Sequence, residues 1–381
     1  MYSMDCKPLF LFGNGLSMAL SSDFSLKKIT TKFITGLKGE EKAFLSELCG
    51  GEQNLSFDDF EYNFSLLEDA YGSVKKYKRF IESSTGELFL KKFSLTNPDL
   101  AKHEEIIKSL YDEYIFQILS LIHGNVTKVA IQQKLGPFCS FLKNQLENCS
   151  KGYVFTLNYD LLAETILLEE IGTGKFTDFC SPTGHFKGTQ IAKYDFDPAL
   201  NDARYGEDYT SSNIELHHLH GSLSMFYDYQ RNKAIKIRSE DILINDVYNT
   251  IHKENWTLYP SIITGGGKSL KMNEYPFEFY FRNFKDYSTY GKYNKLFIVG
   301  YSFRDDHINE LIKRWMSGVG DYTKGLLIVD YKKMPEEQNE FKKFVRTQIK
   351  KRPAIPDACF EFGGVNAIHD ILGTEAKERD K

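Results

Sequence analysis

Five short apolar runs are the feature of this sequence that most constrains its fold. Three of them end in Gly, Asn or Ser and lead into helix-like sequence, which is typical of strands in a parallel α/β sheet. Ligands bind such sheets where the strands end, at the carboxyl edge. The sequence therefore predicts a buried parallel sheet whose strand-to-helix turns share one edge. The predicted strands lie at 8–13, 153–159, 214–221, 296–302 and 325–331.

A long segment with helical periodicity separates the first predicted strand from the second. Within it, Ile107, Tyr111, Tyr114 and Ile118 recur at helical spacing, and Gly124 provides a C-terminal stop. This segment is therefore predicted to be a helical insert. We expect a discontinuous α/β domain at 1–30 and 151–345, the insert at 31–150, a loop over the sheet edge at 175–213 and a C-terminal segment at 346–381.

Composition and charge narrow the class of protein. The chain has 381 residues, 41% of them hydrophobic, so it can bury a substantial core. Its 48 Lys and Arg against 52 Asp and Glu give a net charge of −4, without the basic excess of a protein that binds nucleic acid through phosphates. Apolar stretches such as 114–122 are shorter than the roughly 20 residues of a membrane span. We expect no membrane segment and no nucleic-acid partner.

The six cysteines indicate neither a zinc module nor a disulfide framework. They are scattered along the chain with no Cys-x-x-Cys pair, and reduced thiols in a cytosol are the simplest interpretation. Asp5 precedes the apolar N-terminal run and Gly13-Asn14-Gly15 interrupts it, so this run does not read as a secretory signal. We therefore expect a cytoplasmic protein without a metal ion.

The first turn that can carry chemistry is Gly13-Asn14-Gly15-Leu16-Ser17, directly after an apolar strand. Glycines here let the backbone approach a pyrophosphate closely, and the following helix offers unpaired N–H groups to an anion. A plain strand-turn-helix corner would use the same glycines, so this motif alone leaves both interpretations open. A second turn of this kind, Gly300-Tyr301-Ser302, adds a hydroxyl that can contact phosphate or ribose.

Polar residues also end the second and third predicted strands. Asn158 and Asp160 follow the second, where an Asn could equally cap the next helix. In the third, His218 and His220 would project to one face, but no second cluster of metal ligands has a recognisable spacing. A histidine at a strand's carboxyl end, with a usual pKa of about 6.5, suits a general base. A structural role is the alternative for each of His217, His218 and His220.

Taken together, these motifs resemble those of sirtuin-like NAD-binding proteins, specifically the bacterial sirtuin-like NAD hydrolases of antiphage defence. The resemblance covers residues 1–30 and 150–335, and the order of the motifs is more specific than any single one. It implies a Rossmann-like parallel sheet of the sirtuin-like type with a large helical insert. The motifs stand here as Gly13-Asn14-Gly15-Leu16-Ser17, Asn158-Tyr159-Asp160, His220-Gly221 and Gly300-Tyr301-Ser302.

The resemblance implies an NAD glycohydrolase that releases nicotinamide and ADP-ribose. Asn158 would hold the attacking water or the nicotinamide ribose, His220 would be the base, and Asp160 would orient the site. Rupture of the glycosidic bond develops oxocarbenium character, so the site must position a nucleophile and accept a proton. The residues that the resemblance implies for binding NAD are Gly13, Asn14, Gly15, Ser17, Gly300, Ser302 and Asp330.

Alternatives and partners follow from the same resemblance. Protein-deacylating sirtuins carry a zinc module with paired cysteines, which this sequence lacks, so a zinc-independent deacylase is a runner-up. A non-catalytic sensor of NAD or ADP-ribose is the other. A chain of this length leaves little room for a fused sensor, and it resembles the separate subunit that assembles with a HerA-type hexameric ATPase. The 30 Phe and 23 Tyr residues also lead us to expect a homo-oligomer.

Overall fold

A computed structural model of the chain groups its residues into two compact units. The sheet unit comprises Met1–Phe24, His123–Ile263 and Ser269–Lys381, and the helical unit comprises Ser25–Ile122 and Thr264–Lys268. The structure describes residues 6–94, 100–172, 174–179, 189–191, 194–198, 212–228, 233–237, 258–264 and 271–368.

A six-stranded parallel sheet forms the centre of the sheet unit. Its strand β1 (Pro8–Phe12) is buried along its whole length and lies between β2 (Gly152–Thr156) and β9 (Lys295–Val299). All five apolar runs contribute strands to this sheet, so the predicted Rossmann-like α/β fold is confirmed. Strands buried on both faces read as continuous apolar runs, which is why the sequence identified them. The order is β11-β10-β9-β1-β2-β5, with β5 at Ile214–His218, β10 at Leu326–Val329 and β11 at Phe360–Glu361.

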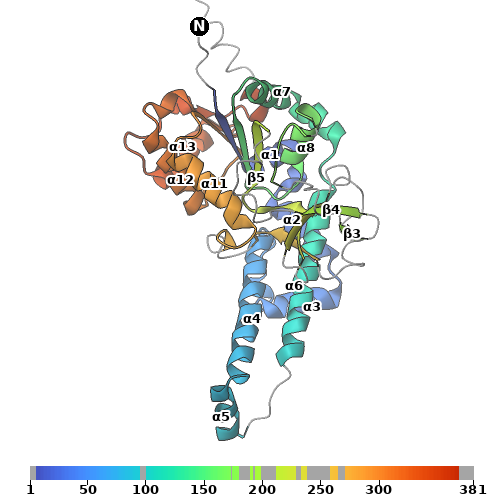
Figure 1. Ribbon diagram of the computed structural model, residues 1–381. Coiled ribbons are helices and arrows are strands. Elements are labelled where there is room, and N and C mark those ends of the chain that lie inside the picture. The colour runs from blue at the N-terminus through green and yellow to red at the C-terminus, as the bar shows by residue number, and fades with distance from the viewer. Residues whose placement is uncertain are drawn as a thin grey trace, which may run out of the picture. The chain divides into compact units, whose positions relative to one another are not determined.

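Helices cover both faces of this sheet (Figure 1): α11, α12 and α13 lie on one face, and α1, α7 and α8 on the other. On the second face, Phe141 and Phe138 of α7 pack edge-on against Phe10 and Phe12 of β1. These contacts bury the apolar strand between two helical layers. The helices are α1 (Asn14–Leu20), α7 (Lys128–Glu147), α8 (Leu162–Glu170), α11 (Phe277–Thr289), α12 (Asp306–Gly318) and α13 (Pro335–Ile349).

A second, five-stranded antiparallel sheet also belongs to the sheet unit, in the order β3-β4-β7-β6-β8. The prediction of a loop at 175–213 is wrong where β3 and β4 lie. Both strands are short and polar, and β4 pairs with β7 from much later in the chain, so neither has a local signal. The strands are β3 (Thr189–Ile191), β4 (Tyr194–Pro198), β6 (Gly221–Asp228), β7 (Lys233–Ile237) and β8 (Leu258–Ile262).

The helical unit is held together by aromatic side chains and by polar contacts between its two long helices. Phe33 packs edge-on against Phe64 and Tyr114. The Tyr111 hydroxyl donates to Glu68 at 2.6 Å, joining α6 to α4. Within the described part of the chain, no helix combines the length and apolarity of a membrane span. The helices are α2 (Leu26–Gly36), α3 (Gly39–Leu48), α4 (Phe60–Ile81), α5 (Ser84–Lys92) and α6 (Leu100–His123).

Candidate functional site

Three strand-to-helix turns meet at the carboxyl edge of the parallel sheet. In register, Phe12 of β1 lies opposite Thr156 of β2 on one side and Val299 of β9 on the other. The turns that follow these three strands therefore begin at one edge, which is where ligands bind open α/β sheets. They bring together the predicted residues Gly13 to Ser17, Asn158, Asp160, Gly300 and Ser302.

The glycines of two turns pack directly against each other. A Cβ on Gly13 would lie 2.6 Å from the Gly300 carbonyl oxygen, and one on Gly300 would lie 2.5 Å from the Gly15 Cα. Gly300 also has φ = 64°, a conformation that favours glycine. The Gly13 and Gly15 amides donate to the carbonyls of Val299 and Gly300 at 2.9 and 2.8 Å. The close contact between the turns is sufficient to explain why glycine is required at these positions. It also uses two backbone amides of the first turn as hydrogen-bond donors.

A buried hydrogen-bond network joins the first turn to the second. The Ser17 hydroxyl donates to Asp160 Oδ2 at 2.5 Å, and Asn158 Nδ2 donates to Ser17 Oγ at 2.9 Å. Asp160 Oδ1 accepts from the Leu162 amide at 2.9 Å and so fixes the start of α8. Ser17 and Asp160 are therefore positioning groups that hold Asn158, whose own side chain reaches the edge of the sheet.

The orientation of the Asn158 amide follows from its partners. Nδ2 also donates to the Gly13 carbonyl at 3.0 Å, and a carbonyl can only accept. The Ser17 hydroxyl gives its hydrogen to Asp160, so it too accepts from Nδ2. Both amide hydrogens are used in this way. Oδ1 makes no hydrogen bond to any described residue and is left as an acceptor for a water or a hydroxyl group.

Burial controls the ionisation of Asp160. The carboxyl is 5% exposed, and desolvation raises its pKa above the usual value, while hydrogen bonds from Ser17 and the Leu162 amide oppose that rise. A carboxyl buried in this way is poorly placed to contact a substrate directly, but it can hold neighbouring groups through hydrogen bonds.

Three other predicted residues at this edge have contacts of their own. The Asn14 side chain donates to the Phe24 carbonyl at 3.2 Å and so holds the chain after α1. Asp330 follows β10, where Oδ1 accepts from the Tyr331 amide at 2.7 Å and Oδ2 pairs with Lys332 at 3.1 Å. Ser302 is exposed. Asn14 is exposed as well, whereas Asp330 is half-buried.

His220 lies in the turn that connects β5 to β6, and its side chain is 4% exposed. The strand ends at His218, so the predicted strand alternation between His218 and His220 does not apply. Gly221 has φ = 84°, and a Cβ there would overlap the Ser261 carbonyl, so this turn requires glycine.

In register, His218 of β5 lies opposite Thr156 of β2. His220 and Asn158 are each two residues beyond that pair and leave the sheet at the same edge.

The two preceding histidines are part of the core. His217 stacks on Phe155 with ring centroids 4.1 Å apart, and its Nε2 lies 3.1 Å from Glu215. His218 is buried, and desolvation lowers its pKa to about 3. Desolvation also lowers the pKa of His217, against the opposing effect of Glu215, so both rings are core groups.

Sequence reasoning missed two groups beside His220. Asp305 and His307 follow the Gly300 turn, and each offers a ligand atom that lies within 4.8 Å of the others and of a His220 ring nitrogen. The available signal was the Asp-Asp-His sequence directly after the late glycine turn. That sequence gave no indication of proximity to His220, because the two segments are far apart in the chain.

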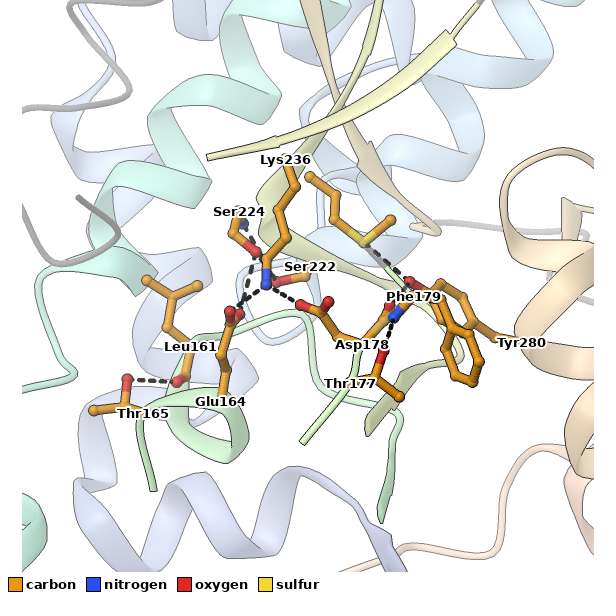
Figure 2. Close-up of polar contacts among 11 residues, drawn as sticks. Leu161, Glu164, Thr165, Thr177, Asp178, Phe179, Ser222, Ser224, Lys236 and Tyr280 are labelled. Carbon is orange, nitrogen blue, oxygen red and sulfur yellow. Dashed lines mark hydrogen bonds and ion pairs between the residues drawn. The ribbon is translucent and has the colours of Figure 1, made fainter. Parts of the chain in front are cut away.

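Sequence reasoning also missed a buried ionic network in the sheet unit (Figure 2). The Lys236 ammonium of β7 contacts both the Glu164 carboxylate of α8 and the Asp178 carboxylate, and Ser224 donates to Glu164 at 3.3 Å. Lys236 is 3% exposed. Burial raises the pKa of Glu164, while the Lys236 charge opposes that rise. The network joins the antiparallel sheet to α8.

Substitution of Lys236 by Met should destabilise the fold by about 3–5 kcal/mol, because Glu164 and Asp178 would stay buried without their counter-charge. Urea unfolding at pH 7 measures this change. The deficit should shrink as the pH falls, since protonation neutralises Glu164, whose pKa in the folded protein is raised above the unfolded value.

Lys313→Met is the matched control for this substitution, because Lys313 pairs with Glu310 at 3.5 Å on the surface. It should change the free energy of unfolding by less than about 0.5 kcal/mol. Equal stability of the two variants would contradict the structural importance of the buried network.

The parallel sheet, its glycine turns and the polar side chains at its carboxyl edge define an α/β protein of the Rossmann-like type. A family model described as the SIR2-like domain matches residues 152–352, more than half of the chain. The chain therefore belongs to the SIR2-like family, whose members are often NAD-dependent enzymes. No protein of curated function matches it. The matched span includes Asn158, Asp160, His220 and Ser302, and it excludes the Gly13–Ser17 turn.

Proposed function

We propose that the chain hydrolyses NAD at the bond between nicotinamide and ribose. The observation that carries the proposal is the fixed Asn158 amide, whose Oδ1 is left as an acceptor at the carboxyl edge while Ser17 and Gly13 hold its Nδ2. The edge is the usual ligand site of such a sheet, and NAD is the general substrate of the SIR2-like family.

The proposed reaction breaks the C1′–N1 glycosidic bond, and its electron pair leaves with nicotinamide. Positive charge develops on C1′ and the ring oxygen of the ribose, and a water molecule adds to C1′. Asn158 Oδ1 accepts a hydrogen bond from this water or from a ribose hydroxyl, which fixes the geometry of attack. His220 accepts the proton that the water loses. The products are nicotinamide, ADP-ribose and one proton.

Release of nicotinamide from NAD by the purified chain tests this proposal directly. An NAD hydrolase releases nicotinamide with NAD and water alone, whereas a deacylase requires an acylated peptide. A sensor binds NAD or ADP-ribose and releases no nicotinamide. Binding of NAD without turnover would therefore replace the hydrolase with the sensor alternative.

The order of the four motifs also supports a role in antiphage defence through NAD depletion, together with a HerA-type ATPase partner. Co-purification of the chain with such an ATPase tests the partner, and NAD levels during infection test the role. The hydrolase proposal does not depend on either result.

A further inference from the structure

Two loops bring two imidazoles and one carboxylate together within the sheet unit. His220 comes from the turn after β5, and Asp305 and His307 flank the first residue of α12. One ligand atom from each lies within 4.8 Å of the other two. His220 is 4% exposed, whereas Asp305 and His307 are half-buried.

The Asp305 carboxylate does not make the helix-capping hydrogen bond expected at its position. Asp305 is the N-cap residue of α12, a position at which Asp usually accepts from the helix backbone, yet its side chain caps nothing. The carboxylate itself forms no hydrogen bond or ion pair with any described residue. Local helix structure therefore does not explain this carboxylate.

The backbone around Asp305 is held firmly. The Tyr301 hydroxyl donates to the Asp305 carbonyl at 3.1 Å and accepts from its amide at 3.3 Å. Asn309 Nδ2 donates to the carbonyl of Phe303, a buried non-glycine residue with φ = 56°. Backbone strain of this kind persists where surrounding contacts impose it and is common at functional sites. The loop presents the Asp305 carboxylate from a fixed backbone.

Two imidazoles and one carboxylate form a donor set for divalent transition metals. Three protein ligands of this kind bind catalytic zinc and leave one position open, whereas Mg²⁺ and Ca²⁺ prefer oxygen ligands. Around zinc, with bonds of about 2.0–2.1 Å, tetrahedral ligand atoms lie about 3.3 Å apart. Zinc binding therefore requires the three ligand atoms, which lie within 4.8 Å of one another, to approach to about this separation.

We propose that His220, Asp305 and His307 bind one Zn²⁺ ion, and that this ion inhibits NAD hydrolysis by occupying the ring nitrogen of His220. The inhibitory part rests on the proposed function, because it requires His220 to be the base. Coordination uses the imidazole lone pair that would otherwise accept a proton from water. Neither the scattered cysteines nor the residue spacing around His218 and His220 predicts a metal ion, but Asp305 and His307 supply a second group of ligand atoms beside His220.

Zinc titration of the tag-free full chain, followed by calorimetry, tests the site without any activity measurement. Wild type should bind about one equivalent, and Asp305→Asn and His307→Gln should each weaken binding at least about tenfold, since even outer partners of a ligand are worth 10–100-fold. Co²⁺ provides a spectroscopic probe of the same ligands. His103→Gln, which alters an exposed histidine of α6, should bind as wild type. Unchanged zinc affinity in both folded site variants would overturn the proposal.

Nicotinamide release then tests the inhibition. In a chelating buffer, Asp305→Asn and His307→Gln should hydrolyse NAD at rates near wild type, and added Zn²⁺ should inhibit wild type and His103→Gln but spare these two variants. Zinc inhibition that is equal in all four proteins would overturn the inhibitory role. If the chain hydrolyses no NAD even in chelator, the proposed function fails, and the titration alone still decides whether the metal site exists.

Discussion

His220→Ala is expected to lower the rate of nicotinamide release by about 10²–10⁴-fold, the usual cost of losing a positioned general base. The fold should survive, because backbone hydrogen bonds hold this turn. The His220 carbonyl accepts from the Ile263 amide at 2.9 Å, and the Leu219 amide donates to the Thr156 carbonyl at 2.9 Å. Single-turnover rates and melting temperatures, recorded in chelating buffer, measure the two effects separately.

The control for His220→Ala is His103→Gln, since His103 is exposed in the helical unit. His217 would be a poor control because its ring stacks on Phe155 and contacts Glu215, so its removal would disturb the core. A folded His220→Ala protein that turns over NAD at the wild-type rate would exclude His220 as the base.

The parallel sheet was predictable because its strands are buried on both faces and therefore form continuous apolar runs. The turns at the strand ends were predictable for a related reason, since glycine and asparagine interrupt those runs. The antiparallel sheet was not, because β3 and β4 are short and polar, and β4 joins the sheet by pairing with β7 from much later in the chain. Lys236 illustrates the same limit, because nothing local distinguishes a buried lysine from an exposed one. The distant Glu164 and Asp178 carboxylates explain its burial.

The sequence could single out Asn158 and His220 as candidate site residues, but it could not show their contacts or the nearness of Asp305 and His307 to His220. Sequence order placed Asn158 and His220 at strand ends, and register explains why they leave the sheet together. The sequence could not show that the Ser17 hydroxyl would hydrogen-bond to Asp160 and Asn158 instead of being available to bind a phosphate. The predicted strand also continued through His220, although β5 ends at His218, because no turn residue precedes Gly221 in that apolar run. Contacts between distant segments decide these points, and local patterns do not report them.

Asn158→Ala should lower kcat for NAD hydrolysis by at least about 10²-fold, the cost of misplacing a reacting group by about 1 Å. Asn158→Asp sharpens the test because it keeps the shape of the side chain and inverts its hydrogen bonding. A carboxylate oxygen would face the Gly13 carbonyl, where Nδ2 now donates at 3.0 Å, and two acceptors repel each other.

The aspartate variant should therefore be as inactive as the alanine variant, although it still carries an acceptor oxygen. Asn148→Ala, at the exposed end of α7, is the matched control and should keep wild-type kcat and KM. Nicotinamide release at several NAD concentrations, with melting temperatures alongside, separates loss of chemistry from loss of fold. Wild-type kcat in folded Asn158→Asp would mean that the amide orientation set by Ser17 and Gly13 does not matter, and the observation on which the proposed function rests would lose its force. Loss of activity in Asn158→Asp together with full activity in Asn148→Ala would tie turnover to the orientation of the Asn158 amide. Only the substitution at Asn158 changes that orientation.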